Sequence, residues 1–199
     1  RGVQPLRIEQ GEEGVPLTQA AHEGWVHFKI EVMDGSTATQ IPRTEIRAKV
    51  WLDTQEEPAH FHIVAYDQSD IRIAAGTVGV WATGEAGAKR FDDLRVAPFI
   101  ATAANIPDIG LVENFESYLP NQNPRNMLDT AEELISQPEI ELFAPIEPSE
   151  PNERIVFGTV SELENIHLHY APAADSGTPE DVLTWTDYTL AGRMRIKGG

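Results

Sequence analysis

Apolar and polar residues alternate with a period of two along much of the chain, which is typical of strands with one buried face. The alternating segments are rich in β-branched and aromatic residues and are bounded by Gly, Pro or Asp. The segments expected to form strands are Trp25 to Met33, Thr44 to Leu52, His60 to Asp67, Gly76 to Ala82, Lys89 to Val96, Glu139 to Phe143, Arg154 to Val160, Ile166 to Tyr170, Thr184 to Leu190 and Arg193 to Lys197. Many strands joined by short turns predict an all-β fold, an antiparallel β-sandwich.

The remaining segments predict little helix. Thr130 to Gln137 is the one expected helix, with Thr130 as N-cap and two acids in the first turn. Ala97 to Gly110 lacks a clean period and is expected to be a connector. Pro145 to Asn152 and Pro172 to Pro179 are expected to be exposed loops.

Charge limits the classes of partner. The chain has 199 residues, with 32 Asp and Glu against 15 Lys and Arg, a net charge of -17. Such a field repels nucleic acid and anionic membranes. No apolar stretch approaches the roughly 20 residues that span a bilayer, so membrane insertion is not expected. The acids are concentrated in Leu111 to Leu190, where Arg125 and Arg154 are the only bases, and the chain contains no Cys.

Two stretches of motifs resemble a known family in part. Trp25 to Val96 carries, in order, WVHFKIEV, IRAKVWLD, FHIVAYDQS, GTVGVW and FDDLRV. This stretch resembles the closing half of a laminin-G-like, concanavalin-A-like jelly-roll domain of the kind found in bacterial surface and carbohydrate-active proteins. Leu111 to Ile196 carries VENFESY, the MLDT turn, RIVFGTVS, IHLHY and WTDYTLAGRMRI, and resembles the opening half. The resemblance implies a jelly roll with Trp51 and Trp81 between its sheets.

The order of the two halves is inverted relative to this family. Residues 1–96 resemble the closing half, 97–110 a connector and 111–199 the opening half. Three origins are open: a window across two tandem jelly rolls, a circular permutant, or a repeat unit whose halves pair with neighbouring copies. Half a sandwich exposes an apolar face and unpaired strand edges. We therefore expect the halves to close on each other or on another copy, and we expect self-association.

The resemblance implies a noncatalytic module of an extracellular or cell-surface protein. Its expected role is structural or adhesive, as a repeat of a surface protein or a self-assembling filament, with glycan as a candidate ligand. The alternative is a carbohydrate-active enzyme, a glycoside hydrolase, or its sugar-binding module.

The sequence lacks the catalytic motifs that the alternative, a carbohydrate-active enzyme, would need. Retaining glycosidases need two carboxyl groups about 5 Å apart, and laminarinase-type enzymes of this fold supply them from a Glu-x-Asp-x-x-Glu run that the sequence lacks. It also lacks the Gly-x-Ser-x-Gly turn of serine hydrolases. We therefore expect no catalytic residues.

Two binding sites remain as candidates. Jelly-roll modules often hold calcium where the first and last strands meet, and the matching oxygen ligands are Glu116, Asp92 and Asp93. His60 with His62, and His167 with His169, have the spacing of zinc ligands on one strand face, although a solvated face explains them as well. For glycan contact, Trp185 and Tyr188 are the best exposed aromatic candidates.

Overall fold

The described part of the protein is all-β, as the sequence predicts. The computed structural model describes residues 7–11, 24–35, 41–82, 87–98, 111–119, 127–129, 144–146, 156–159, 166–170 and 185–197. These residues form strands and turns and include no helix. They likewise include no helical segment with the length and hydropathy of a membrane span. The helix expected at Thr130 to Gln137, the strand at Glu139 to Phe143 and the loop at Pro172 to Pro179 lie outside the described residues.

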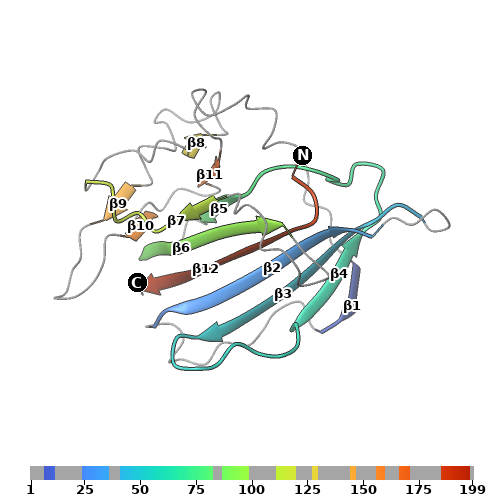
Figure 1. Cartoon of the computed structure of the whole chain (residues 1–199), viewed down its shortest axis with the longest axis horizontal. Helices are drawn as coiled ribbons and strands as arrows, with labels where there is room; N and C mark the ends of the chain where they lie inside the picture. Colours follow the sequence, from blue (N-terminus) through green and yellow to red (C-terminus); the bar gives the residue numbers. More distant parts are fainter. Residues whose placement is uncertain are drawn as a thin grey trace.

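The described strands form two sheets with antiparallel pairings (Figure 1). The main sheet has the order β1-β4-β3-β2-β12-β6-β10-β9, with β7 also paired to β6. Its strands are β1 (Arg7–Gln10), β2 (Val26–Asp34), β3 (Thr44–Leu52), β4 (Ile63–Asp67), β6 (Ala88–Pro98), β7 (Leu111–Glu113), β9 (Ala144–Ile146), β10 (Val156–Thr159) and β12 (Tyr188–Lys197). The second sheet has the order β5-β11-β8, from β5 (Gly79–Ala82), β11 (Ile166–Tyr170) and β8 (Met127–Asp129).

Strand β12 joins the two segments of the chain within one sheet. It lies between β2 and β6 and is hydrogen-bonded to both, so a strand of 111–199 sits among strands of 1–96 (Figure 1). The sequence predicted two strands here, separated near Gly192, but β12 is continuous. A Cβ at Gly192 would lie 2.8 Å from Leu94 Cδ2 and 2.9 Å from Phe28 Cζ. Gly192 is therefore a site of close packing, and not a break in the strand.

The alternation of β2 and β3 gives the main sheet two distinct faces. The two strands pair without interruption, from Val26 opposite Leu52 to Asp34 opposite Thr44. Phe28 and Ile30 lie on the side of the second sheet, which we call the inner face. The residues between them in sequence, such as Lys29, point to the opposite side, which we call the outer face.

The core lies between the inner face and the second sheet. It combines Leu94, Val96 and Phe157 of the main sheet with side chains of the second sheet, among them Val80. Phe115 and Phe157 are both fully buried, and their rings stack at 4.9 Å between centroids. Phe115 lies two residues after β7, so the segment that follows this short strand supplies one of the largest core side chains.

Several strand limits differ from the sequence prediction. β4 begins at Ile63 and not at His60; His62 lies at a bend before the strand, where its Nδ1 accepts the Val50 N–H at 3.3 Å. β5 begins at Gly79, whereas Gly76 forms an isolated bridge with Trp185. Pro145 was expected in a loop but lies in β9, at the end of the main sheet's strand order, where a residue without an N–H is tolerated.

Candidate functional site

Asp92 and Asp93, two of the three predicted calcium ligands, lie at an irregular point of β6. The register between β6 and β12 shifts between Ala191 and Arg193, and Asp93 has a left-handed φ of 52°. This local bulge lets two consecutive carboxylates approach the same region of β12. Asp92 is fully buried, whereas Asp93 is exposed.

Both oxygens of Asp92 already have donors within the protein. Arg193 binds Asp92 Oδ2 through Nε at 3.2 Å and also through Nη2, and the Asp93 backbone N–H donates to Oδ1 at 2.8 Å. Arg193 Nε also lies 3.1 Å from Asp93 Oδ2. Burial raises the pKa of Asp92 above its ordinary value, and the hydrogen bond and charge of Arg193 oppose that rise. A cation at Asp92 would therefore have to displace Arg193.

Glu116, the third predicted calcium ligand, is exposed after β7. Its backbone N–H donates to Asn114 Oδ1 at 3.3 Å. The neighbouring Glu113 is engaged elsewhere, since its Oε1 accepts the Phe115 N–H at 2.8 Å. Within the described ranges, no three His, Asp or Glu side chains are grouped as metal ligands. Calcium binding by Glu116, Asp92 and Asp93 stays a prediction.

The structure describes the side chains of only one of the two histidine pairs that were considered as zinc ligands. His60 is exposed and His62 is half-buried, and neither lies in a strand. His167 and His169 lie in β11, opposite Trp81 and Gly79, but their side chains are outside the description. The prediction that His60 and His62 share one strand face is therefore wrong.

Trp185 and Tyr188, the predicted glycan contacts, pack at the margin of the core. The Trp185 ring stacks on Tyr170 at 5.7 Å and meets Tyr188 at 6.5 Å in a tilted arrangement. Both side chains are partly buried, and they line a hollow of about 210 Å³ that also includes Val32 and Ile46. Burial raises the pKa of the Tyr188 hydroxyl. Their role in glycan binding stays a prediction.

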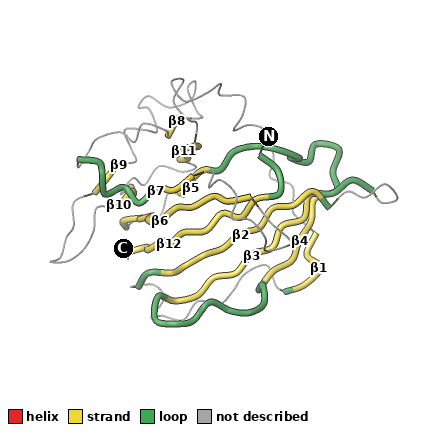
Figure 2. The backbone as a smooth tube through the Cα atoms, in the orientation of Figure 1, coloured by secondary structure: helices red, strands yellow, loops and turns green. Residues whose placement is uncertain are grey.

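The loop that joins β3 to β4 (Figure 2) is held to the outer face of the main sheet by a network of ion pairs. Glu57 of this loop accepts from Lys29 at 2.5 Å and lies 2.7 Å from Lys49. Lys49 Nζ also donates to the Pro58 carbonyl at 2.7 Å, and it lies 5.0 Å from the centre of the Phe61 ring. Burial alone would raise the pKa of Glu57, but the hydrogen bonds and charges of the two lysines together outweigh it, so the pKa lies below its ordinary value. These contacts attach the loop to the sheet.

Two tryptophans lie near this network. The Trp51 ring stacks on His27 at 5.4 Å, and His27 Nε2 is 2.7 Å from Asp53 Oδ1. The Arg193 guanidinium lies 4.7 Å from the centre of the Trp25 ring. The outer face therefore combines partly exposed aromatic rings with charged groups.

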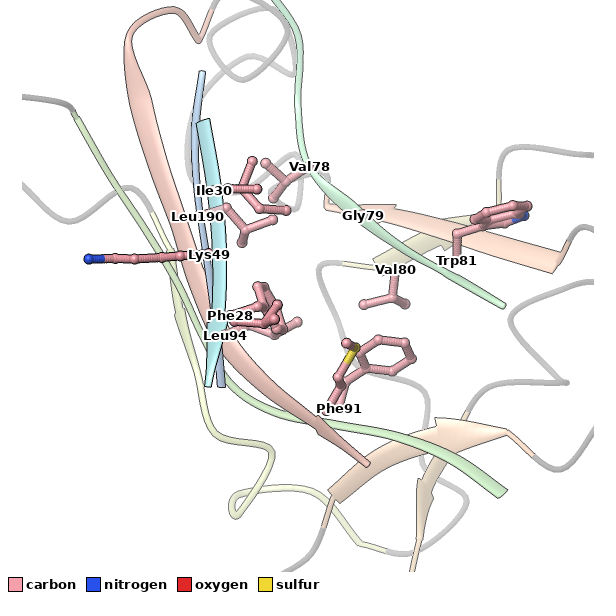
Figure 3. A pocket seen from close by; sticks show the side chains of 13 residues that line it. Phe28, Ile30, Lys49, Val78, Gly79, Val80, Trp81, Phe91, Leu94 and Leu190 are labelled. Carbon is pink, nitrogen blue, oxygen red and sulfur yellow. The ribbon is translucent and has the colours of Figure 1, made fainter. Parts of the chain in front are cut away.

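A cavity between the sheets is a feature that the sequence did not predict. It has a volume of about 270 Å³ and lies between β5 and the inner face of β2, β3, β6 and β12 (Figure 3). Its walls include Phe28, Ile30, Ala48, Val50 and Val80. The Lys49 side chain borders it but points away, toward the outer face (Figure 3).

The position of Trp81 explains part of this cavity. Trp51 and Trp81 were expected between the sheets, but Trp81 is 59% exposed and points away from the cavity (Figure 3). Trp51 lies on the outer face, stacked on His27. The alternation of Val78, Val80 and Ala82, all buried, places Trp81 on the opposite side of β5. Strict alternation from Val78 to Ala82 therefore predicts that the Trp81 side chain is exposed.

Taken together, fold and geometry define an all-β protein of mostly antiparallel strands. Comparison with protein-family models, with curated proteins and with solved structures found no match for this chain.

Proposed function

We propose that this chain is a noncatalytic structural or adhesive module of an extracellular or cell-surface protein. The observation that carries the proposal is the fully buried Asp92 paired with Arg193 at the junction of β6 and β12. This carboxylate connects the two segments of the chain, and Arg193 holds it in place. The resemblance of both segments to jelly-roll modules of surface proteins supports the same role.

The charged groups of the outer face favour a structural role over catalysis. The Glu45 carboxylate forms ion pairs with the guanidinium groups of Arg43, at 3.0 Å, and Arg47, at 2.7 Å. The Glu57 carboxylate forms ion pairs with Lys29 and Lys49. Each carboxylate is thus bound by two cations, whereas a glycosidase needs a protonated acid with a raised pKa beside an ionised partner. The proposal predicts no turnover of oligosaccharides by purified protein. Turnover that persists through purification and is lost in an Asp92→Asn or Glu45→Gln variant would contradict it.

Glycan binding is the second candidate, and the outer-face aromatics favour it. Trp25 and Trp51 are partly exposed there beside Arg193 and His27. A glycan array should be probed with the native protein and with Trp51→Ala and Trp185→Ala. Binding lost only in Trp51→Ala would assign the glycan to the outer face, and binding lost only in Trp185→Ala would assign it to the aromatic pair predicted from the sequence.

A further inference from the structure

The cavity between the sheets has walls of uniform chemical character. Both sheets contribute to it, and the side chains that they direct into it are apolar, among them Phe28, Ile30, Val50, Val80, Leu94 and Leu190 (Figure 3). Lys49 is the one ionisable residue of the lining. Its ammonium group lies on the outer face, where it donates to the Pro58 carbonyl at 2.7 Å, so its charge is outside the cavity.

These walls offer little to water. A buried water molecule typically makes about three hydrogen bonds, and an apolar cavity without such partners stays dry. The larger wall belongs to the main sheet, in which β2 and β12 each have a hydrogen-bonded strand on both sides, so their backbone groups are engaged in the sheet. The chemistry of the walls therefore selects an uncharged apolar occupant.

The size of the cavity sets the size of that occupant. A cavity of about 150 Å³ lined by Leu, Ile and Phe is large enough to bind benzene. The cavity between the sheets, at about 270 Å³, has almost twice that volume. In proportion it holds about ten carbon atoms, which is the size of naphthalene or of a short alkyl chain.

The space is a consequence of small side chains on facing strands. Sheets that pack face to face lie about 10 Å apart, and large side chains normally fill the gap. β5 directs Val78 and Val80 into the cavity and β3 directs Ala48 and Val50 into it, so neither strand supplies a side chain larger than Val. Trp81, which is large enough to fill the space, points away from it (Figure 3).

The lining also provides an entrance and some adaptability. Gly79 belongs to the lining and is exposed to solvent, and it has no side chain to cover the cavity at that point. Met194 is part of the opposite wall, and its unbranched, polarizable side chain adjusts to the shape of a neighbouring group. A ligand can therefore enter at β5 and be enclosed by the inner face.

We propose that this cavity binds a small uncharged apolar molecule of about ten carbon atoms. The proposal goes beyond the structural or adhesive role, since it adds a ligand in the interior, away from the aromatic residues considered for glycan contact. A carboxylate or ammonium group inside the cavity would have no partner, and burial of an unpaired charge is costly. Ligands that place a charge inside the cavity are therefore excluded.

The first test uses naphthalene as the probe and methyl-labelled native protein. The methyl signals of Ile30, Val50 and Val80 should shift as naphthalene is added, whereas those of Ile71, which is 67% exposed and outside the lining, should stay in place. The melting temperature should rise with naphthalene concentration, because the ligand binds the folded state. Naphthalene-2-sulfonate has the same rings with a charge and should bind at least about tenfold more weakly.

Variants that fill the cavity give the second test. Ala48→Phe fills it from β3, and Val80→Phe fills it from β5, so either should raise the dissociation constant for naphthalene by about tenfold or more. Ala191→Phe is the matched control for Ala48→Phe. Leu190 lines the cavity, so Ala191 faces the opposite side of the main sheet, and this variant should bind naphthalene like the native chain.

Three results would overturn the inference. They are unshifted Ile30, Val50 and Val80 methyl signals at the solubility limit of naphthalene, native affinity in a folded Ala48→Phe or Val80→Phe variant, and equal affinity for the sulfonate. Shifts that follow protein concentration without naphthalene would assign the cavity to a second copy and would also overturn it. The methyl signals of the native chain decide the matter even if neither variant folds. None of these results bears on oligosaccharide turnover, which tests the proposed function.

Discussion

Arg193 of β12 binds the fully buried carboxylate of Asp92 in β6, across a separation of 101 residues in sequence. The pair joins the two segments of the chain at the centre of the main sheet. Its geometry also determines how the protein should respond to mutation and to pH.

Removing the cation should destabilise the fold strongly. Arg193→Met leaves the Asp92 carboxylate buried without its partner, and breaking a buried pair in this way lowers the free energy of unfolding by about 3 kcal/mol. Urea unfolding measures the change through the midpoint. The double variant Arg193→Met with Asp92→Asn should recover part of the loss, since no buried charge remains. A single variant with native stability would show that the pair contributes little.

The pH dependence should follow the raised pKa of Asp92. Because burial raises the pKa of the folded state above that of the unfolded chain, the folded state holds the proton more tightly. The contribution of Asp92 to stability is then largest below about 3.9, the unfolded pKa. It is lost as the pH rises through the higher folded pKa. Asp92→Asn should remove this component from the pH profile of unfolding, and an unchanged profile would contradict the assignment.

Gly192 offers a measure of how tightly the inner face is packed. Gly192→Ala would place its Cβ within 3 Å of the ends of the Leu94 and Phe28 side chains. Both side chains border the cavity and can move into it, so we expect a loss of about 1 kcal/mol, at the low end for overpacking. Gly76→Ala is the control, because its nearest contact would be Ile73 Cγ2 at 3.6 Å. A loss of stability in Gly192→Ala well above about 1 kcal/mol would mean that the Leu94 and Phe28 side chains cannot move.

The outer-face loop should depend more on Lys49 than on Lys29. The Lys49 side chain is 8% exposed and contacts Glu57, Pro58 and Phe61, whereas the Lys29 side chain is 28% exposed and pairs with Glu57. Lys49→Met should lower the free energy of unfolding by about 1 to 2 kcal/mol, from the loss of charge-assisted hydrogen bonds. Lys29→Met should cost less than about 1 kcal/mol, because its pair is more solvated. Thermal unfolding of the two variants side by side tests the order.

The period-two pattern was sufficient to predict β3 and most of β2, because both strands have one apolar and one charged face. It was insufficient where long-range contacts decide the structure. Gly192 resembles a strand break in sequence, yet Phe28 and Leu94 pack so closely there that a residue without a side chain fits best.

The candidate site shows the same limit. Asp92 has the chemistry of a calcium ligand, but its partner Arg193 belongs to a strand whose position no local pattern reveals. Trp81 was assigned to the core from the jelly-roll resemblance, whereas the alternation along β5 decides its side. The cavity depends on several strands at once, so it could not have been predicted from any one of them.

The central place of β12 has a consequence for biosynthesis. During translation β2 and β6 emerge from the ribosome well before β12, and until β12 follows, each lacks the neighbour that lies between them in the finished sheet. Such late, non-local pairing gives a high contact order and slow folding. Nascent chains should therefore pass through a stage with exposed strand edges, at which chaperones would have the most to protect.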